Sequence, residues 1–299
     1  MINMQNKEKR PTSRIFLYPL LIVMAIIPLI VHQKEYATGL SQYQWFSSQE
    51  NGNDFFLYYK SFWLVVMAAL MLVILCIKIW REKAYQMLPK VLIPAGIYGL
   101  FIIISMIFSM NHTFSLKGSM DQFESGFVLL GYLIFMYYAY LLIDTEEHLE
   151  FLIKAWLISM AILCILGFLQ VIGHDFFATD LGKKLILPRE IWDRLDNLSF
   201  SFGKNRIYLT LYNPNYVGVY ASIAIPILVT LLLFTKQIKM KVIYGILTIG
   251  MIVCIIGSES KTAFLTLAIV AVVAILIFRT KLEVDFIRLN CCHYFILWY

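Results

Sequence analysis

The chain has 299 residues, of which 60% are hydrophobic and only 15% are charged, and its mean hydropathy is +0.74. Soluble domains carry about 25% charged residues, so this composition excludes an ordinary soluble enzyme and predicts a polytopic membrane protein. The net charge of +6 comes from basic residues at the ends of apolar runs. Because no nucleic-acid-binding motif accompanies them, no nucleic-acid partner is expected.

Apolar segments predict an all-α fold with about eight transmembrane spans, since ~20 apolar residues cross ~30 Å of hydrocarbon. The seventh segment is the weakest because it is short. No internal repeat or linker divides the chain, so residues 1–299 are expected to form one integral membrane domain. The predicted spans cover residues 15–32, 61–80, 91–110, 126–143, 152–173, 214–234, 242–257 and 262–278.

Basic residues at the span ends predict a cytoplasmic N-terminus, because cytoplasmic loops are enriched in lysine and arginine. The loop at 174–211 would then be outside, although it is also basic. Two interpretations of these outside charges remain open: they bind a ligand, or they bind anionic lipid head groups. Within the loop, Pro188 is predicted to open a short amphipathic helix on the outer leaflet, with Ile191, Trp192, Leu195 and Leu198 on its apolar side.

Over residues 206–218, the end of a polar loop is followed by the start of an apolar segment. Asn213 is a favoured N-cap and Pro214 suits the first helical position, so a helix is predicted to begin at Pro214 and continue to Phe234. The N–H groups of its first turn would form a partly positive site for an anion, with Arg206 nearby and Asn215 after the proline. The alternative is a capped helix beside an interfacial arginine.

Two further polar clusters precede later spans on the same predicted outer side. Residues 117–126 precede the fourth span and include Asp121 and Glu124, while residues 257–262 precede the eighth and include Ser260 and Lys261. Helix N-termini and cations gathered on one face would suit a pyrophosphate. We therefore expect the clusters to lie close together.

These motifs resemble the bacterial O-antigen ligase and polymerase family of membrane glycosyltransferases. The resemblance covers about residues 90–280 and rests on Asn213-Pro214-Asn215-Tyr216, Ser260-Lys261-Thr262-Ala263 and the stretch from Lys117-Gly118 to Glu124-Ser125-Gly126, in this order between apolar spans. It implies an enzyme without metal or other cofactor at the outer face of the bacterial cytoplasmic (inner) membrane. Such an enzyme moves or polymerises glycan from an undecaprenyl-pyrophosphate carrier, acting on a polysaccharide or lipid acceptor in cell-surface polysaccharide biosynthesis.

The resemblance also suggests site residues, because arginines near the outer helix ends hold the pyrophosphate in that family. Lys261 stands where the family's Ser-Arg pair has its arginine; lysine keeps the charge but loses the bidentate fork that suits phosphate oxygens. The residues predicted to bind substrate are Arg206, Asn213, Asn215, Ser260, Lys261 and Glu124.

The chain departs from the family beyond its eighth segment. Family members continue into a large outer loop that carries a histidine, whereas residues 282–299 do not resemble that continuation, so a C-terminal truncation is expected and no catalytic residue is assigned. Cys291 and Cys292 lack the ligand spacing of a metal site. Whether the chain is an active enzyme stays open. The alternatives are an inactive fragment, or a non-catalytic transporter or lipid-binding membrane protein, although the near absence of mid-span charge weakens the transporter interpretation.

Overall fold

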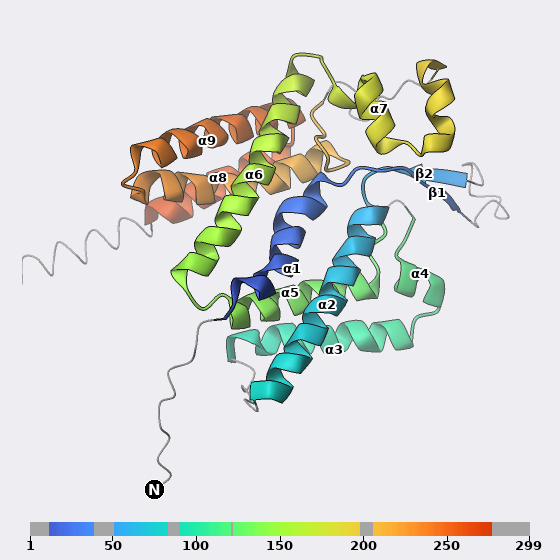
Figure 1. The fold of residues 1–299 in the computed structure, drawn as a ribbon, viewed down its shortest axis with the longest axis vertical. Helices are drawn as coiled ribbons and strands as arrows, with labels where there is room; N and C mark the ends of the chain where they lie inside the picture. Colours follow the sequence, from blue (N-terminus) through green and yellow to red (C-terminus); the bar gives the residue numbers. More distant parts are fainter. Residues whose placement is uncertain (1–11, 39–50, 83–89, 121, 198–205, 277–299) are drawn as a thin grey trace, which may run out of the picture. The chain divides into compact units, whose positions relative to one another are not determined.

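The computed structural model describes residues 12–38, 51–82, 90–120, 122–197 and 206–276. These residues are mostly helical, with one two-stranded sheet among them (Figure 1). The chain divides into two compact units whose segments alternate along the sequence, and each unit is described separately. The prediction of a single domain stays a prediction.

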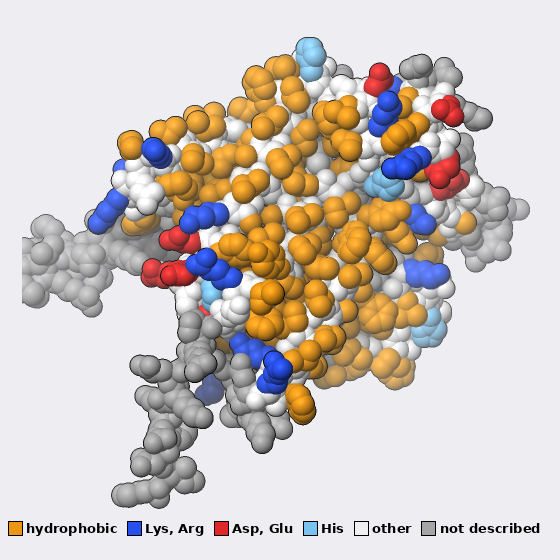
Figure 2. All heavy atoms as spheres, in the orientation of Figure 1, with side chains coloured by type: hydrophobic (Ala, Val, Ile, Leu, Met, Phe, Trp, Pro, Cys, Tyr) orange, Lys and Arg blue, Asp and Glu red, His pale blue; other side chains and the backbone are white. Residues whose placement is uncertain are grey.

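All eight predicted apolar segments are helical. Within the described residues, three of these helices are 10–17 residues long: Arg14–Leu29, Gly126–Leu142 and Lys261–Leu276, the last of which reaches the end of the described residues. Five are long and apolar enough to cross a membrane: Tyr58–Arg81, Lys90–Ile107, Glu146–Val171, Pro214–Phe234 and Ile238–Ser258. Figure 2 shows hydrophobic side chains over much of the face in view, and many large hydrophobic side chains are exposed, as a surface in contact with lipid requires. The structure thus agrees with a helical membrane protein, while the number of spans and the side of the N-terminus stay predictions.

The seventh segment is longer than predicted. Helix α9 (Ile238–Ser258) has 21 residues and begins before Lys239 and Lys241, which the sequence analysis left outside the span. Lysine is a good helix former, and its long stem can lie along apolar surface while the ammonium group stays in water. Hydropathy alone therefore places the start of this helix too late.

The first unit runs to Leu166 and includes His174–Ser201 and Thr210–Tyr212. Its sheet pairs β1 (Lys34–Ala37) with β2 (Asn51–Asp54) in antiparallel register, with Lys34 opposite Asp54. Its helices, including the short 3₁₀ (η1, η3 to η6) and π (η2) pieces, are η1 (Arg14–Leu17), α1 (Tyr18–Leu21), η2 (Ile22–Ile26), η3 (Ile27–Leu29), α2 (Tyr58–Glu82), η4 (Lys90–Leu92), α3 (Ile93–Ile107), α4 (His112–Lys117), α5 (Gly126–Leu142), most of α6 (Glu146–Val171), η5 (Phe176–Ala178), α7 (Asp180–Ile186) and η6 (Arg189–Asn197).

Apolar side chains from η1, α1, α2, α5 and α6 form the core of the first unit. Helices α2 and α5 approach closely at Gly131, where an added Cβ would lie 3.0 Å from Leu64 Cδ2 and 3.3 Å from Ala68 Cβ. The buried core cluster contains Leu17, Leu20, Met71, Leu75, Tyr138, Leu142 and Leu152. A small residue at the crossing lets two apolar helices come into direct contact, which favours their association in lipid.

Thr210 is held in the first unit by two hydrogen bonds. The Lys60 ammonium at the start of α2 donates to the Thr210 carbonyl, and the Thr210 hydroxyl donates to the carbonyl of Pro28 at 2.7 Å. Asp54 caps the same end of α2, accepting the N–H groups of Leu57 and Tyr58 at 2.9 and 2.8 Å. Burial raises the pKa of the Asp54 carboxyl, against the opposing effect of these N–H donors and of Lys60.

The amphipathic segment after Pro188 is helical, but it forms the 3₁₀ helix η6. Leu195 is buried, and the indole N–H of Trp192 donates to the Leu187 carbonyl at 3.2 Å. The cationic groups of Lys184 and Arg189 each lie 5.9 Å from the Trp192 ring centroid. Leu198, the fourth residue of the predicted apolar side, lies outside the described residues.

The second unit contains Gly167–Gly173, Phe202–Leu209 and Asn213–Tyr299. Helix α8 (Pro214–Phe234) begins and ends as predicted, and it packs along α9. The helix Lys261–Leu276 follows α9 after a short turn. Gly167 lies against Cys254 and Leu209, where an added Cβ would be 2.5 Å from Cys254 Sγ, so the end of α6 packs directly on α9.

A polar junction joins the start of the first unit to the turn between α5 and α6. Asp144 Oδ2 accepts the N–H of Thr12 at 3.0 Å and its hydroxyl at 2.9 Å, while Asp144 Oδ1 lies 2.8 Å from Nδ1 of the buried His148. Partial burial alone would raise the pKa of Asp144. The hydrogen bonds from Thr12 and the charge interaction with His148 outweigh that effect and lower this pKa.

We expect Asp144→Ala to lower the free energy of unfolding by about 1 to 3 kcal/mol at neutral pH, because the Thr12 donors lose a charged acceptor. Since the pKa of folded Asp144 lies below its ordinary value of 3.8, this stabilisation is complete above that value and is lost as the pH falls through the lowered pKa. Thermal unfolding of wild type and variant in detergent at several pH values measures how this stabilisation depends on pH. Asp193→Ala, at an exposed aspartate, is the control, and an Asp144 effect that persists at the lowest pH would contradict the assignment.

Candidate functional site

Helix α8 begins at Pro214 under a cap formed by Asn213. The Asn213 side chain accepts the N–H of Asn215 at 2.9 Å, and its carbonyl accepts the N–H groups of Tyr216 and Val217 at 2.9 and 3.3 Å. These donors of the first turn are therefore already satisfied. Asn213 shapes the helix entrance, as predicted, and α8 offers an anion the field of its dipole rather than free N–H groups. Asn215 is exposed beside it.

Gly218 brings this helix entrance into contact with the turn after α9. A Cβ added at Gly218 would lie 2.7 Å from each of Ala263 Cβ, Ser260 Cβ and Ser260 Oγ. One turn further along α8, the hydroxyl of Ser222 donates to the Gly218 carbonyl at 2.7 Å and lies 3.5 Å from the Ala263 carbonyl. Two of the three predicted clusters thus lie together in the second unit.

Arg206 is attached to the same turn. The N–H of the next residue, Ile207, donates to the Gly257 carbonyl at 3.0 Å. Arg206 itself donates from one terminal nitrogen to the Glu259 carbonyl at 2.9 Å, and its Nε lies 3.4 Å from Glu259 Oε2. The guanidinium therefore sits beside the 258–262 turn, where its charge is balanced by a carboxylate that is itself 72% exposed.

The turn at Ser260 is tightly constrained. Glu259 has a φ of +52°, a left-handed conformation that is unfavourable for a residue with a side chain. Ser260 is buried and its hydroxyl lies 3.1 Å from that of Thr262, so it shapes the turn beneath α8. Lys261 is exposed and forms no ion pair with the residues that the structure describes. The groups available to an anion at this turn are the Lys261 ammonium and the part-exposed Arg206 guanidinium.

The third predicted cluster, residues 117–126, lies in the first unit. Helix α4 ends at Gly118, whose φ of +87° suits only glycine and whose missing side chain leaves room for the backbone of Phe123. Ser125 caps α5 by accepting the N–H of Val128 at 3.3 Å. Glu124 is exposed, and Asp121 lies outside the described residues. Helix α5 thus begins at Gly126, as predicted, and Ser125 is its N-cap.

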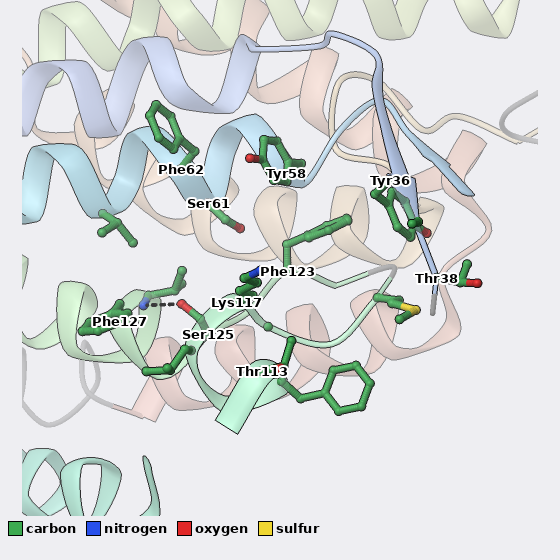
Figure 3. Close-up of a pocket in the computed structure, with 17 residues that line it drawn as sticks. Tyr36, Thr38, Tyr58, Ser61, Phe62, Thr113, Lys117, Phe123, Ser125 and Phe127 are labelled. Atoms are coloured by element: carbon green, nitrogen blue, oxygen red, sulfur yellow. Dashed lines mark hydrogen bonds between the residues drawn. The ribbon is translucent and has the colours of Figure 1, made fainter. Parts of the chain in front are cut away.

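Beside this loop is a pocket of 630 Å³ (Figure 3). Its wall comes from β1, from the first turns of α2 and α5, and from α4 with the following loop. The Phe123 ring is 5.2 Å from the Tyr36 ring and 5.4 Å from the Tyr58 ring, both edge-on. Lys117 lines the pocket, and the ammonium of Lys34 lies 5.2 Å from the Tyr58 ring centroid.

The pocket could not be predicted from the sequence because its wall is assembled from segments that are far apart in the chain. The capping and glycine signals of residues 117–126 were visible, but Tyr36 and Thr38 reach the pocket only through the pairing of β1 with β2. The aromatic richness of the stretch between the first two spans was the available signal. Its residues 39–50 lie outside the described residues.

Comparison with known proteins finds no relative: no protein-family model, no curated protein and no solved structure matches the chain. Within the described residues, no three His, Cys, Asp or Glu side chains gather as a metal site requires. Cys291, Cys292 and the tail 282–299 lie outside those residues. The site is thus defined by its own geometry, which places two cations at a capped helix entrance.

We expect Gly218→Ala to destabilise the protein by about 1 to 3 kcal/mol, because the new methyl group would overlap two Cβ atoms that are fixed to the backbone. The matched control is Gly245→Ala in α9, where an added Cβ meets nothing within 4 Å. Thermal unfolding in detergent compares the two variants. Equal stability would show that α8 and the Ser260 turn are not in close contact.

Proposed function

We propose that the chain acts in cell-surface polysaccharide biosynthesis as a protein like the O-antigen ligases and polymerases. It would bind a glycan linked to undecaprenyl pyrophosphate at the outer face of the bacterial cytoplasmic membrane and pass it to a polysaccharide or lipid acceptor. The observation that carries the proposal is the proximity of Arg206 and the Ser260–Lys261 turn to the α8 entrance. The order of the three motifs between apolar segments supports the same function.

The reaction would need charge stabilisation more than any other contribution. The bond between the anomeric carbon and the pyrophosphate oxygen breaks while the acceptor hydroxyl oxygen bonds to that carbon and releases its proton to water. Negative charge grows on the departing pyrophosphate. Prearranged cations and a helix N-terminus stabilise such charge without reorganisation. Arg206, Lys261 and the α8 dipole could supply this field, and Asn213 fixes the direction of the helix entrance.

Glu259 indicates how an anion would approach Arg206. Its carboxylate is exposed and lies 3.4 Å from Arg206 Nε without a well-aligned hydrogen bond. An exposed ion pair of this kind is weak, because water screens both charges. A pyrophosphate carries more charge and several acceptor oxygens, so it would displace the carboxylate from the guanidinium.

We expect Arg206→Ala to weaken binding of undecaprenyl pyrophosphate by about tenfold or more, since a charge-assisted hydrogen bond is lost. Lys261→Gln should weaken it by about fivefold, the effect of one exposed cation at a membrane surface. Equilibrium binding to the protein in nanodiscs measures both. Lys236→Gln, an exposed lysine after the other end of α8, is the matched control. If Arg206→Ala and Lys261→Gln bind like wild type, the proposed pyrophosphate site is wrong.

Glu259→Gln should act in the opposite direction and tighten binding by a few-fold, because Arg206 no longer has a competing carboxylate. The same binding assay measures this change. A separate assay of glycan transfer from a lipid-linked donor to an acceptor tests the proposed transferase activity. Weaker binding in Glu259→Gln would mean that Glu259 positions Arg206 instead of competing for it. Tight donor binding without transfer would overturn the transferase activity while leaving the binding site in place.

A further inference from the structure

The pocket of the first unit has a mostly apolar wall. Phe62 and Val65 come from α2, Phe127 and Val128 from α5, and Phe123 from the preceding loop (Figure 3). Its volume of 630 Å³ falls within the range of pockets that enclose small organic ligands, which are lined in the same way. Such a wall favours a ligand with a substantial hydrocarbon part.

Two phenylalanines of the pocket wall are also exposed. Phe62 is 50% exposed and Phe127 is 48% exposed, so both belong to the pocket wall and to the apolar outer surface of α2 and α5. Further along α5 the two helices meet at Gly131, in contact with Leu64. A chain entering from the bilayer would therefore lie beside the first turns of the two helices.

The charge carried by the described pocket lining is positive. Of the described residues that line it, Lys117 alone carries a charge. The Tyr58 ring, which is part of the wall, has the Lys34 ammonium over its face at 5.2 Å. Glu124 is exposed and does not line the pocket. A ligand with an anionic end fits this charge distribution.

Other ligand classes fit the lining less well. A free sugar presents many hydroxyl groups that each need a donor or acceptor once water is removed. The described lining residues include no Asp, Glu, Asn, Gln or Arg side chain, so their neutral polar groups are the hydroxyls of Tyr36, Thr38, Tyr58, Ser61, Thr113 and Ser125, of which the last already caps α5. A cationic ligand would find no carboxylate among the described lining residues.

We propose that this pocket binds an amphipathic lipid, with its hydrocarbon chain between the first turns of α2 and α5 and its anionic headgroup at Lys117. Apolar burial supplies affinity for the chain, and the lysine selects the charge of the headgroup. The proposal concerns the first unit alone. It stands independently of glycan transfer and of the Arg206 site.

The test uses the full chain in phosphatidylcholine nanodiscs with a small fraction of phosphatidic acid that carries a photoreactive diazirine in its acyl chain. After illumination, peptide mapping should find the label on residues 62–65 of α2 and 127–128 of α5. Val65→Trp fills the pocket and should reduce this labelling about tenfold. Val73→Trp on the same helix, at a position 54% exposed and outside the pocket, should leave it unchanged.

The headgroup is tested with Lys117→Gln, which should reduce labelling about fivefold. Lys154→Gln, at an exposed lysine paired with Glu150, is its matched control and should label like wild type. Unlabelled phosphatidic acid should displace the probe, while glycerol 3-phosphate at the same concentration should not. If Val65→Trp does not fold, Ser61→Phe fills the pocket from another lining position and must give the same loss of labelling.

Three outcomes would overturn the proposal. Label spread evenly over exposed helix surfaces and unaffected by the filling variants would show ordinary surrounding lipid. Displacement by glycerol 3-phosphate would show a site for a free anion. Equal labelling by a neutral diacylglycerol probe would show that Lys117 does not select the headgroup.

Discussion

The close approach of Gly218 to Ser260 and Ala263 is the constraint on which the candidate site in the second unit depends. Because no side chain intervenes, the first turn of α8 packs directly on the turn that follows α9. The Ile207 to Gly257 hydrogen bond attaches the loop that carries Arg206 to the same turn. Polar groups from three separate stretches of the chain are thus brought together at one helix entrance. Small residues commonly permit such contacts between helices in membranes, where no hydrophobic effect drives association.

The structure separates residues that shape the site from residues that can meet a ligand. Asn213 and Ser260 are occupied by capping and turn hydrogen bonds, whereas Arg206 keeps a part-exposed guanidinium and Lys261 an exposed ammonium group. Glu259 was not singled out from the sequence, yet it balances the charge of Arg206. Its left-handed backbone holds the end of α9 in the shape that the contact with α8 requires. The candidate site therefore has two cations, and the availability of one of them, Arg206, depends on the neighbouring Glu259.

The two units present different chemistry for lipid ligands. In the second unit, cations lie at the turn that packs on the start of α8, which suits a phosphate group. In the first unit, a mostly apolar pocket has Lys117 in its lining, which suits a ligand with both a hydrocarbon chain and an anionic headgroup. Both features occur where apolar helices begin, because there the backbone leaves the hydrocarbon and polar side chains become tolerable. The same constraint explains the capping roles of Asn213, Ser125 and Asp54 at these positions.

The sequence by itself determined the helical membrane class, the eight apolar helices and the start of α8 at Pro214, because hydrophobic length and capping chemistry are local properties. It placed the start of α9 too late, since interfacial lysines lower hydropathy without ending a helix. Only the tertiary structure decided that Arg206 pairs with Glu259, that Gly218 contacts Ser260, and that Tyr36 and Phe123 share a pocket. These contacts join residues far apart in the chain, and local pattern carries no information about which helices pack together.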